Sequence, residues 1–146
     1  MGKVFWEGSA LLAPAPPALV TCGTMEEPNV LTIAWTGIIC PRPAMTYISV
    51  RPSRYSYGLI RQTGEFAINL TPSRLVKAAD FCGVRSGARV DKFAQCGLHP
   101  LPAQRISAPI LEECPVALEC RVTESRLLGT HELFLAEILG VDVDEQ

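Results

Sequence analysis

The chain has 146 residues, of which 48% are hydrophobic and 19% are charged, and its formal net charge is −2. This length suits one domain with one sizeable core, so we expect a single domain over residues 1–146. The charge provides no basic face for nucleic acid, and no apolar run reaches the roughly 20 residues of a membrane-spanning helix. The high apolar fraction suggests that some surface is buried against a partner subunit.

The N-terminal apolar stretch at residues 10–20 is interrupted by three prolines, which argues against a secretory signal. Six cysteines contain no C-x-x-C pair. Only Cys96 and His99 stand at ligand spacing, so we expect no metal site. The even number of cysteines permits disulfides, but buried free thiols in a cytoplasmic protein are the favoured interpretation.

The first half of the chain reads as short strands divided by proline and glycine. Residues 18–24, 30–36 and 44–50 are rich in β-branched and aromatic side chains and predict strands, with a turn at 26–29 and a break at 40–43. Residues 53–62 follow a proline and predict a short helix. Residues 65–70 predict another strand, and Thr71-Pro72-Ser73 opens a helix that runs to about Phe81.

Residues 86–102 are polar and predict a loop. Apolar and polar residues alternate over residues 116–123, as in a half-buried strand. Residues 127–130 then predict a turn, and residues 131–141 a second long strand. Many short strands without regular βαβ alternation indicate an antiparallel barrel rather than a Rossmann sheet.

Nucleotide and hydrolase signatures such as G-x-G-x-x-G, the P-loop, G-x-S-x-G and H-E-x-x-H do not occur. Three places could instead face a ligand. Residues 29–37 mix hydrogen-bonding groups with Trp35, although a turn Asn, a strand Thr and a core Trp are the favoured explanation from these residues alone. Residues 49–57 place cations and hydroxyls at a helix start, which suits either a phosphate or a solvated, capped turn. His131 begins a strand and is either a ligand contact or a structural group.

Together these segments resemble the flavin reductase-like family of FMN-binding split β-barrels. The likeness is carried, in chain order, by Asn29-x-x-Thr32-x-Ala34-Trp35-Thr36-Gly37, by Ser49-Val50-Arg51 and Tyr55-Ser56-Tyr57, and by the segments 64–70, 86–93 and 129–138. It covers nearly all of residues 18–143. Within that family the sequence looks most similar to the flavoredoxins, which transfer electrons. The resemblance implies a mainly β fold, an antiparallel FMN-binding split β-barrel with a few short helices.

The resemblance also implies a cofactor and its contacts. FMN would be bound by Asn29, Thr32, Trp35, Thr36, Ser49, Val50, Arg51, Ser56, Tyr57, Lys92 and His131, with His131 near the flavin or its nicotinamide partner. The flavin itself carries the electron chemistry, so no residue is named as catalytic. The family habit further implies a homodimer, with NAD(P)H or a redox protein as electron donor.

Two features depart from the family pattern. Family members continue with a further strand and helix, so a C-terminal tail is expected to be absent after Gln146. The segment Arg51-Pro52-Ser53-Arg54 replaces a lysine-bearing variant associated with the flavoredoxins. The function predicted is an FMN-dependent oxidoreductase that moves electrons from NAD(P)H or a reduced donor to flavin or a protein acceptor. The alternatives are a non-catalytic FMN carrier and a pyridoxamine-phosphate-oxidase-like protein.

Overall fold

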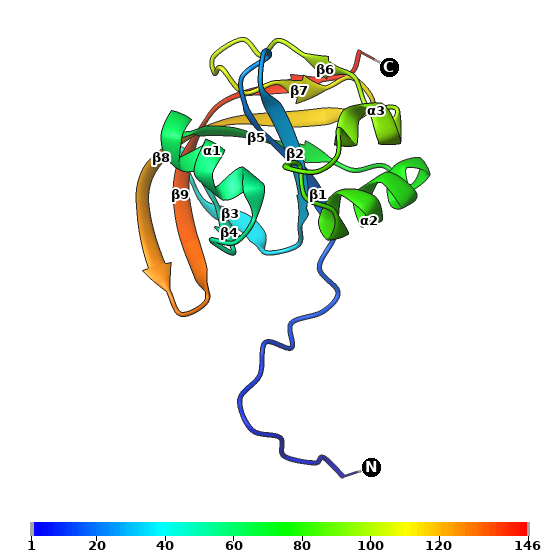
Figure 1. Ribbon diagram of the computed structural model, residues 1–146. Coiled ribbons are helices and arrows are strands. Elements are labelled where there is room, and N and C mark those ends of the chain that lie inside the picture. The colour runs from blue at the N-terminus through cyan, green and yellow to red at the C-terminus, as the bar shows by residue number, and fades with distance from the viewer. Residues whose placement is uncertain (1, 146) are drawn as a thin grey trace.

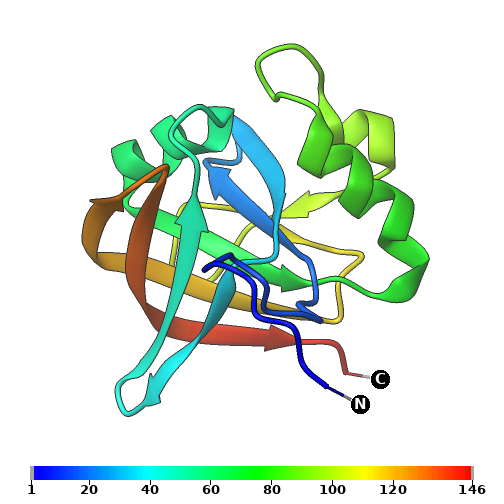
Figure 2. The same ribbon diagram turned by 90° about the horizontal axis from the view of Figure 1, so that it is seen from below.

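A seven-stranded antiparallel sheet forms the centre of the computed structural model, which describes residues 2–145 (Figure 1). Its strands are β1 (Ala18–Gly23), β2 (Pro28–Ile33), β3 (Thr36–Pro41), β4 (Ala44–Val50), β5 (Glu65–Leu70), β8 (Val116–Leu128) and β9 (His131–Val143), in the order β2-β1-β5-β8-β9-β4-β3. The sheet curls strongly, and the β8–β9 hairpin wraps one side of it (Figure 2). A separate two-stranded ribbon pairs β6 (Pro100–Leu101) with β7 (Ile110–Leu111). The predicted mainly β, antiparallel barrel is confirmed.

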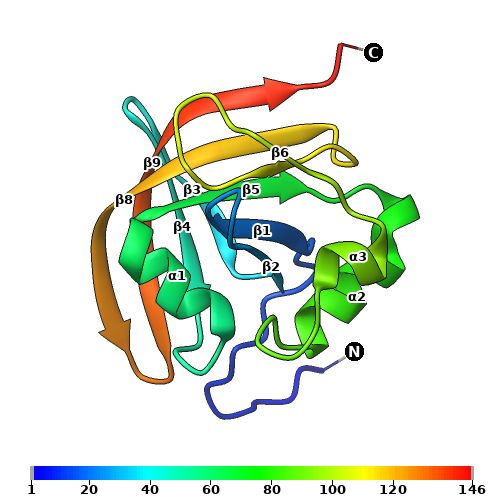
Figure 3. The same ribbon diagram turned by 45° about the horizontal axis from the view of Figure 1, so that its top comes forward.

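Alternating side chains divide the sheet into an inner and an outer face. Val20, Leu31 and Phe66 point inward and are at most 2% exposed, in a core that also receives Ile60 from α1 (Tyr55–Thr63). The neighbouring positions Leu19 and Val30 point outward. They are covered by α2 (Val76–Val84), which follows the one-turn helix η1 (Ser73–Leu75), and by α3 (Lys92–Cys96). Figure 3 shows α1 and the pair α2 and α3 at separate places around the barrel.

The two edge strands β2 and β3 are consecutive in the chain but do not pair with each other. Ala34 and Trp35 connect them, and the backbone N–H of Ser49 on β4 donates to the Trp35 carbonyl at 3.1 Å. The sheet is therefore open between its two edge strands, β2 and β3, beside this connection.

Two sequence predictions are wrong in detail. The strand expected over residues 30–36 is interrupted at Ala34 and Trp35, and a further strand, β3, begins at Thr36. Residues 86–102 are not all loop, because they include α3 and β6. Helix α3 starts where the Asp91 carboxylate accepts hydrogen bonds from the Phe93 and Ala94 backbone N–H groups, a local cap that outweighs the polar composition. The other predicted strands and helices are present, with ends shifted by a few residues.

Residues 2–17 form an extended segment that leads into β1 and has no helix or strand (Figure 1). Its large apolar side chains, including Phe5, Trp6 and Leu12, are at least 70% exposed. Within the described residues, no helix has the length and apolar character needed to cross a membrane.

Two carboxyl groups meet across the β8–β9 pair. Glu119 is 1% exposed and accepts hydrogen bonds from the backbone N–H groups of Gln104 and Arg105. Burial opposes its ionisation, but hydrogen bonds from Asp142 and these N–H groups lower the pKa of Glu119. Burial, then the hydrogen bond and the charge of Glu119, raise the pKa of Asp142 to about 6. Asp142 therefore holds a proton that it donates to Glu119 at mildly acid pH.

This pair predicts a specific pH dependence of stability. The pKa of Asp142 rises from 3.8 to about 6 on folding, so its contribution is complete below pH 3.8 and is lost as the pH rises through 6. Between about pH 5 and pH 7.5 the wild type should lose about 1 kcal/mol relative to Asp142→Asn, a value reduced for partial exposure. Denaturant unfolding of both proteins at the two pH values measures the difference. Parallel pH profiles would show that Asp142 titrates normally.

Candidate functional site

The first pocket occupies the split in the barrel and has a volume of about 220 Å³. Its lining comes from β2, from the connection to β3, from the end of β4 and from the start of β9: Leu31, Thr32, Ile33, Ala34, Trp35, Ser49, Val50, Arg51, Arg54 and His131. The Trp35 and His131 rings lie 4.8 Å apart, tilted by 44°. Trp35 is 49% exposed, so an aromatic pair forms one wall that a planar ligand can reach.

A second pocket of about 140 Å³ continues from the first, with which it shares Leu31 and Arg54. It lies at the start of α1 and beneath the α2–α3 connection, and is lined by Asn29, Leu31, Ser53, Arg54, Tyr55, Ser56, Val84, Arg85, Ser86 and Lys92. Three of these residues are cationic and three are serines, and none of the described lining residues is acidic. This end of the cleft therefore has the composition of an anion site.

Lys92 is the most deeply buried cation of the second pocket, with 2% exposure. Its ammonium donates to the Val30 carbonyl at 2.7 Å and to the Cys82 carbonyl at 3.1 Å. Burial lowers the pKa of Lys92, and the positive charge of Arg54 lowers it further, while Cys82 opposes the shift. An ammonium group has three donors, so one remains for a ligand after these two bonds. An anion beside it would relieve the cost of the buried charge.

Arg54 connects the two pockets and was not among the predicted ligands. Its guanidinium donates to the carbonyls of Gly83 at 2.7 Å and Cys82 at 3.2 Å, both at the C-terminal end of α2. The signal in the sequence was its place immediately before α1, in the segment Arg51-Pro52-Ser53-Arg54. The residues next to Arg54 in the sequence give no sign that its guanidinium would bind carbonyl groups of α2.

A close approach of the 85–91 segment shapes the second pocket. Asn29 donates to the Ser56 hydroxyl at 2.6 Å, and both side chains are at most 4% exposed. A Cβ atom placed on Gly87 would lie 2.2 Å from Asn29 Oδ1. Only glycine allows the backbone to pass this close, so Gly87 keeps the segment against the cleft.

The structure brings most of the predicted ligands together. Nine of them line the two pockets: Asn29, Thr32, Trp35, Ser49, Val50, Arg51, Ser56, Lys92 and His131. Thr36 and Tyr57 lie outside both linings. The Thr36 hydroxyl donates to the Tyr47 carbonyl at 2.7 Å, and the Tyr57 hydroxyl donates to Glu132 at 2.8 Å. The assignment of each residue to a cofactor stays a prediction.

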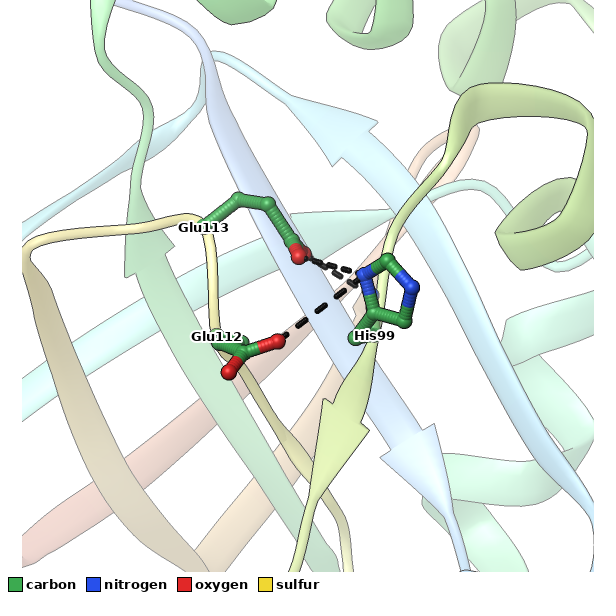
Figure 4. A group of neighbouring side chains, drawn as sticks. All are labelled: His99, Glu112 and Glu113. Carbon is green, nitrogen blue, oxygen red and sulfur yellow. Dashed lines mark hydrogen bonds and ion pairs between the residues drawn. The ribbon is translucent and has the colours of Figure 1, made fainter.

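Another polar group lies at the β6–β7 ribbon, where His99, Glu112 and Glu113 converge (Figure 4). Nδ1 of His99 lies 2.7 Å from Glu113, whose carboxylate also accepts the His99 backbone N–H at 2.8 Å. The hydrogen bond to Glu113 raises the pKa of His99. These contacts account for the group as a connection between two short strands, and none of its members lines the cleft.

Comparison with known proteins agrees with this geometry. Residues 11–146 match the flavin reductase like domain. The chain belongs to the flavin reductase-like family. Flavoredoxin of Desulfovibrio vulgaris (Miyazaki F) is similar in structure, with a TM-score of 0.90 and 34% identity over 99% of this chain and 78% of that one. Flavoredoxin from Methanosarcina acetivorans gives a TM-score of 0.92 and 29% identity over 100% and 77% of the two chains.

A curated relative adds an activity to the comparison. An NADPH-flavin oxidoreductase of Streptomyces viridifaciens is 30% identical over 130 residues, which cover 86% of this chain and 65% of that protein. The predicted resemblance to the flavin reductase-like family, with flavoredoxins among its similar structures, is thus confirmed.

The donor set of the cleft fits a flavin of this family. The aromatic and aliphatic first pocket suits a planar ring system, whereas the cationic second pocket suits a phosphate. Together the two volumes reach the lower end of the roughly 300–1,000 Å³ range of ligand pockets. Trp35 and His131 would contact the ring end, and Arg54, Ser56 and Lys92 would hold the phosphate end.

Proposed function

We propose that this protein binds FMN in the two-pocket cleft and transfers electrons from NAD(P)H to a flavin or protein acceptor. The observation that carries the proposal is the junction, at Leu31 and Arg54, of an aromatic pocket with a cationic one. Flavin without phosphate would leave the second pocket unfilled. The similarity to an NADPH-flavin oxidoreductase supports a nicotinamide donor.

When bound, FMN would supply both hydride and single-electron chemistry. The chain's own residues have the simpler tasks of binding and orientation. Arg54 and Lys92 are already fixed by α2 carbonyls, so they need little reorganisation to receive a phosphate. Val50 and Leu31, both at most 2% exposed, exclude water from the inner wall of the first pocket. The exposed Trp35 leaves one side open to an electron donor.

A second candidate function is an FMN electron carrier that exchanges electrons only with proteins. The structural similarity to two flavoredoxins favours it. Anaerobic mixing of the FMN-loaded protein with NADH or NADPH separates the candidates. Loss of the flavin absorbance within seconds supports the oxidoreductase, whereas reduction by a protein donor alone supports the carrier. A protein that binds neither FMN nor another flavin would overturn both.

A homodimer is also proposed. Ile38 and Ile39 on β3, and Leu127 and Leu128 at the end of β8, are two apolar pairs, 45–67% exposed, that a partner subunit would cover. Light scattering at micromolar concentration should report about twice the chain mass of 15.9 kDa. A monomer that still binds FMN would place the whole cofactor site within one chain.

The phosphate assignment predicts a preference for FMN over riboflavin that depends on Arg54. A charge-assisted hydrogen bond contributes about 1.5–3 kcal/mol, so Arg54→Gln should weaken FMN binding by at least about tenfold. Riboflavin has no phosphate, so its affinity should stay the same. Titration of each apoprotein with both flavins gives the ratio of the two dissociation constants. A change in FMN affinity alone indicates a lost phosphate contact, whereas a change in both indicates a general distortion.

Arg61→Gln is the matched control for Arg54→Gln. Arg61 is an exposed cation of α1, the helix that Arg54 precedes, and it contacts Tyr57 and Glu132 rather than the cleft. The ratio of its dissociation constants for FMN and riboflavin should equal that of the wild type. Equal dissociation constants for the two flavins in the wild type itself would refute the phosphate site.

His131 is expected to tune the redox potential. Its ring packs at a tilt against Trp35 at the first pocket, and an imidazole donor aimed at the flavin would stabilise the charge gained on reduction. His131→Leu should therefore lower the FMN midpoint potential by roughly 30–60 mV, equivalent to 1.4–2.8 kcal/mol over two electrons. Spectroelectrochemical titration measures this shift. Unchanged potential with reduced thermal stability would mean that His131 only packs against Trp35.

A further inference from the structure

Two thiols lie side by side where α2 meets α3. The Sγ atoms of Cys82 and Cys96 are 4.0 Å apart, and both cysteines are free. A disulfide needs about 2.05 Å between its sulfur atoms. The two sulfur atoms therefore lie about 2 Å farther apart than in a disulfide.

The surroundings give the two thiols different roles. Cys82 is fully buried among Leu19, Val30 and Phe93, whereas Cys96 is half-buried at the end of α3. Burial, and then the neighbouring Cys96, raise the pKa of Cys82 to about 12, which keeps it protonated. A small oxidant therefore reaches Cys96 first, and Cys82 is the resolving thiol that reacts with the oxidised Cys96.

Both cysteines belong to segments that hold the cations of the second pocket. The Cys82 carbonyl accepts hydrogen bonds from Lys92 at 3.1 Å and from Arg54 at 3.2 Å. Cys96 belongs to the same five-residue helix as Lys92. A covalent link between the two cysteines would thus connect the acceptor of the Lys92 hydrogen bond to the helix that carries Lys92.

We propose that Cys82 and Cys96 form a reversible disulfide, with hydrogen peroxide as oxidant, that locks α3 to the end of α2 and so keeps Lys92 in place at the cationic pocket that receives the cofactor phosphate. The effect on the cofactor rests on the proposed function, whereas the disulfide itself does not. The Cys96 thiolate takes one oxygen from hydrogen peroxide and releases hydroxide, which leaves a sulfenic acid. The Cys82 sulfur then forms the S–S bond, its proton leaves, and the sulfenic oxygen departs as water. Two thiols are oxidised and one peroxide is reduced to two waters.

Mass spectrometry of the whole protein tests disulfide formation. Treatment with a small excess of hydrogen peroxide should remove the mass of two hydrogen atoms, and non-reducing peptide mapping should place the link between Cys82 and Cys96. Cys96→Ser should prevent this loss of mass. Cys40→Ser is the control and should not prevent it, since the Cys40 thiol donates to the Pro43 carbonyl on the β3–β4 turn, outside the α2–α3 contact. Sulfinic acid at Cys96, or a link to the buried Cys114 instead, would overturn the proposal. Mapping of the wild type decides the question even if a variant fails to fold.

FMN titration of the oxidised and reduced proteins tests the coupling. Locking α3 against α2 in the binding geometry should lower the FMN dissociation constant about threefold on oxidation, and a thiol reductant should reverse the change. The dissociation constant of riboflavin, which has no phosphate, should not respond. Equal FMN affinity of the two forms, with the disulfide mapped, would overturn the coupling. Absence of FMN binding in both forms would instead refute the proposed function and leave the mapped disulfide standing.

Discussion

Helix α2 ends with carbonyl groups that no later helical N–H reaches, and two cations from separate elements bind them. Arg54 donates to the carbonyls of Cys82 and Gly83, and Lys92 shares the Cys82 carbonyl. The negative end of the helix dipole stabilises both charges. Because Arg54 precedes α1 and Lys92 begins α3, this contact fixes three helices around one point. Burial, and to a smaller degree the positive charge of Arg54, lower the pKa of Lys92. An anion placed between the two cations would complete the electrostatic balance.

The barrel provides the second half of this arrangement through strand β2. Its alternation sends Leu31 to the inner face and Val30 to the outer face, while the Val30 carbonyl accepts from Lys92. One strand therefore lines the aromatic pocket, supports α2 and positions the buried ammonium. Since β2 is an edge strand, its far side carries no sheet partner, and the cleft occupies that side. The split in the barrel is thus the feature that makes room for a ligand.

The sequence predicts best where the signal is local. The alternation at 116–123 identified β8, and the proline-bounded apolar runs identified β1, β4 and β5, because each depends only on neighbouring residues. Nine cleft residues were predicted from a family resemblance rather than from periodicity. Arg54 was missed because its partners lie 28 and 29 positions later in the chain, at a helix end whose location depends on tertiary packing. Helix α3 was missed because five residues carry too little periodicity to outweigh a polar composition.

The two ends of the cleft place different demands on the chain. At the cationic end, Lys92, Ser56 and Asn29 are buried and hydrogen-bonded, which favours tight and slow binding of one group. At the aromatic end, Trp35 is half-exposed and held mainly by the His131 ring. A cofactor anchored by its phosphate can keep its ring accessible, since affinity does not depend on enclosing the ring. Substitutions at the buried end should therefore change affinity, and substitutions at the open end should change the potential and the choice of electron donor. Under the proposed function, this separation would let one fold serve as a reductase or as a carrier with the same cofactor anchor.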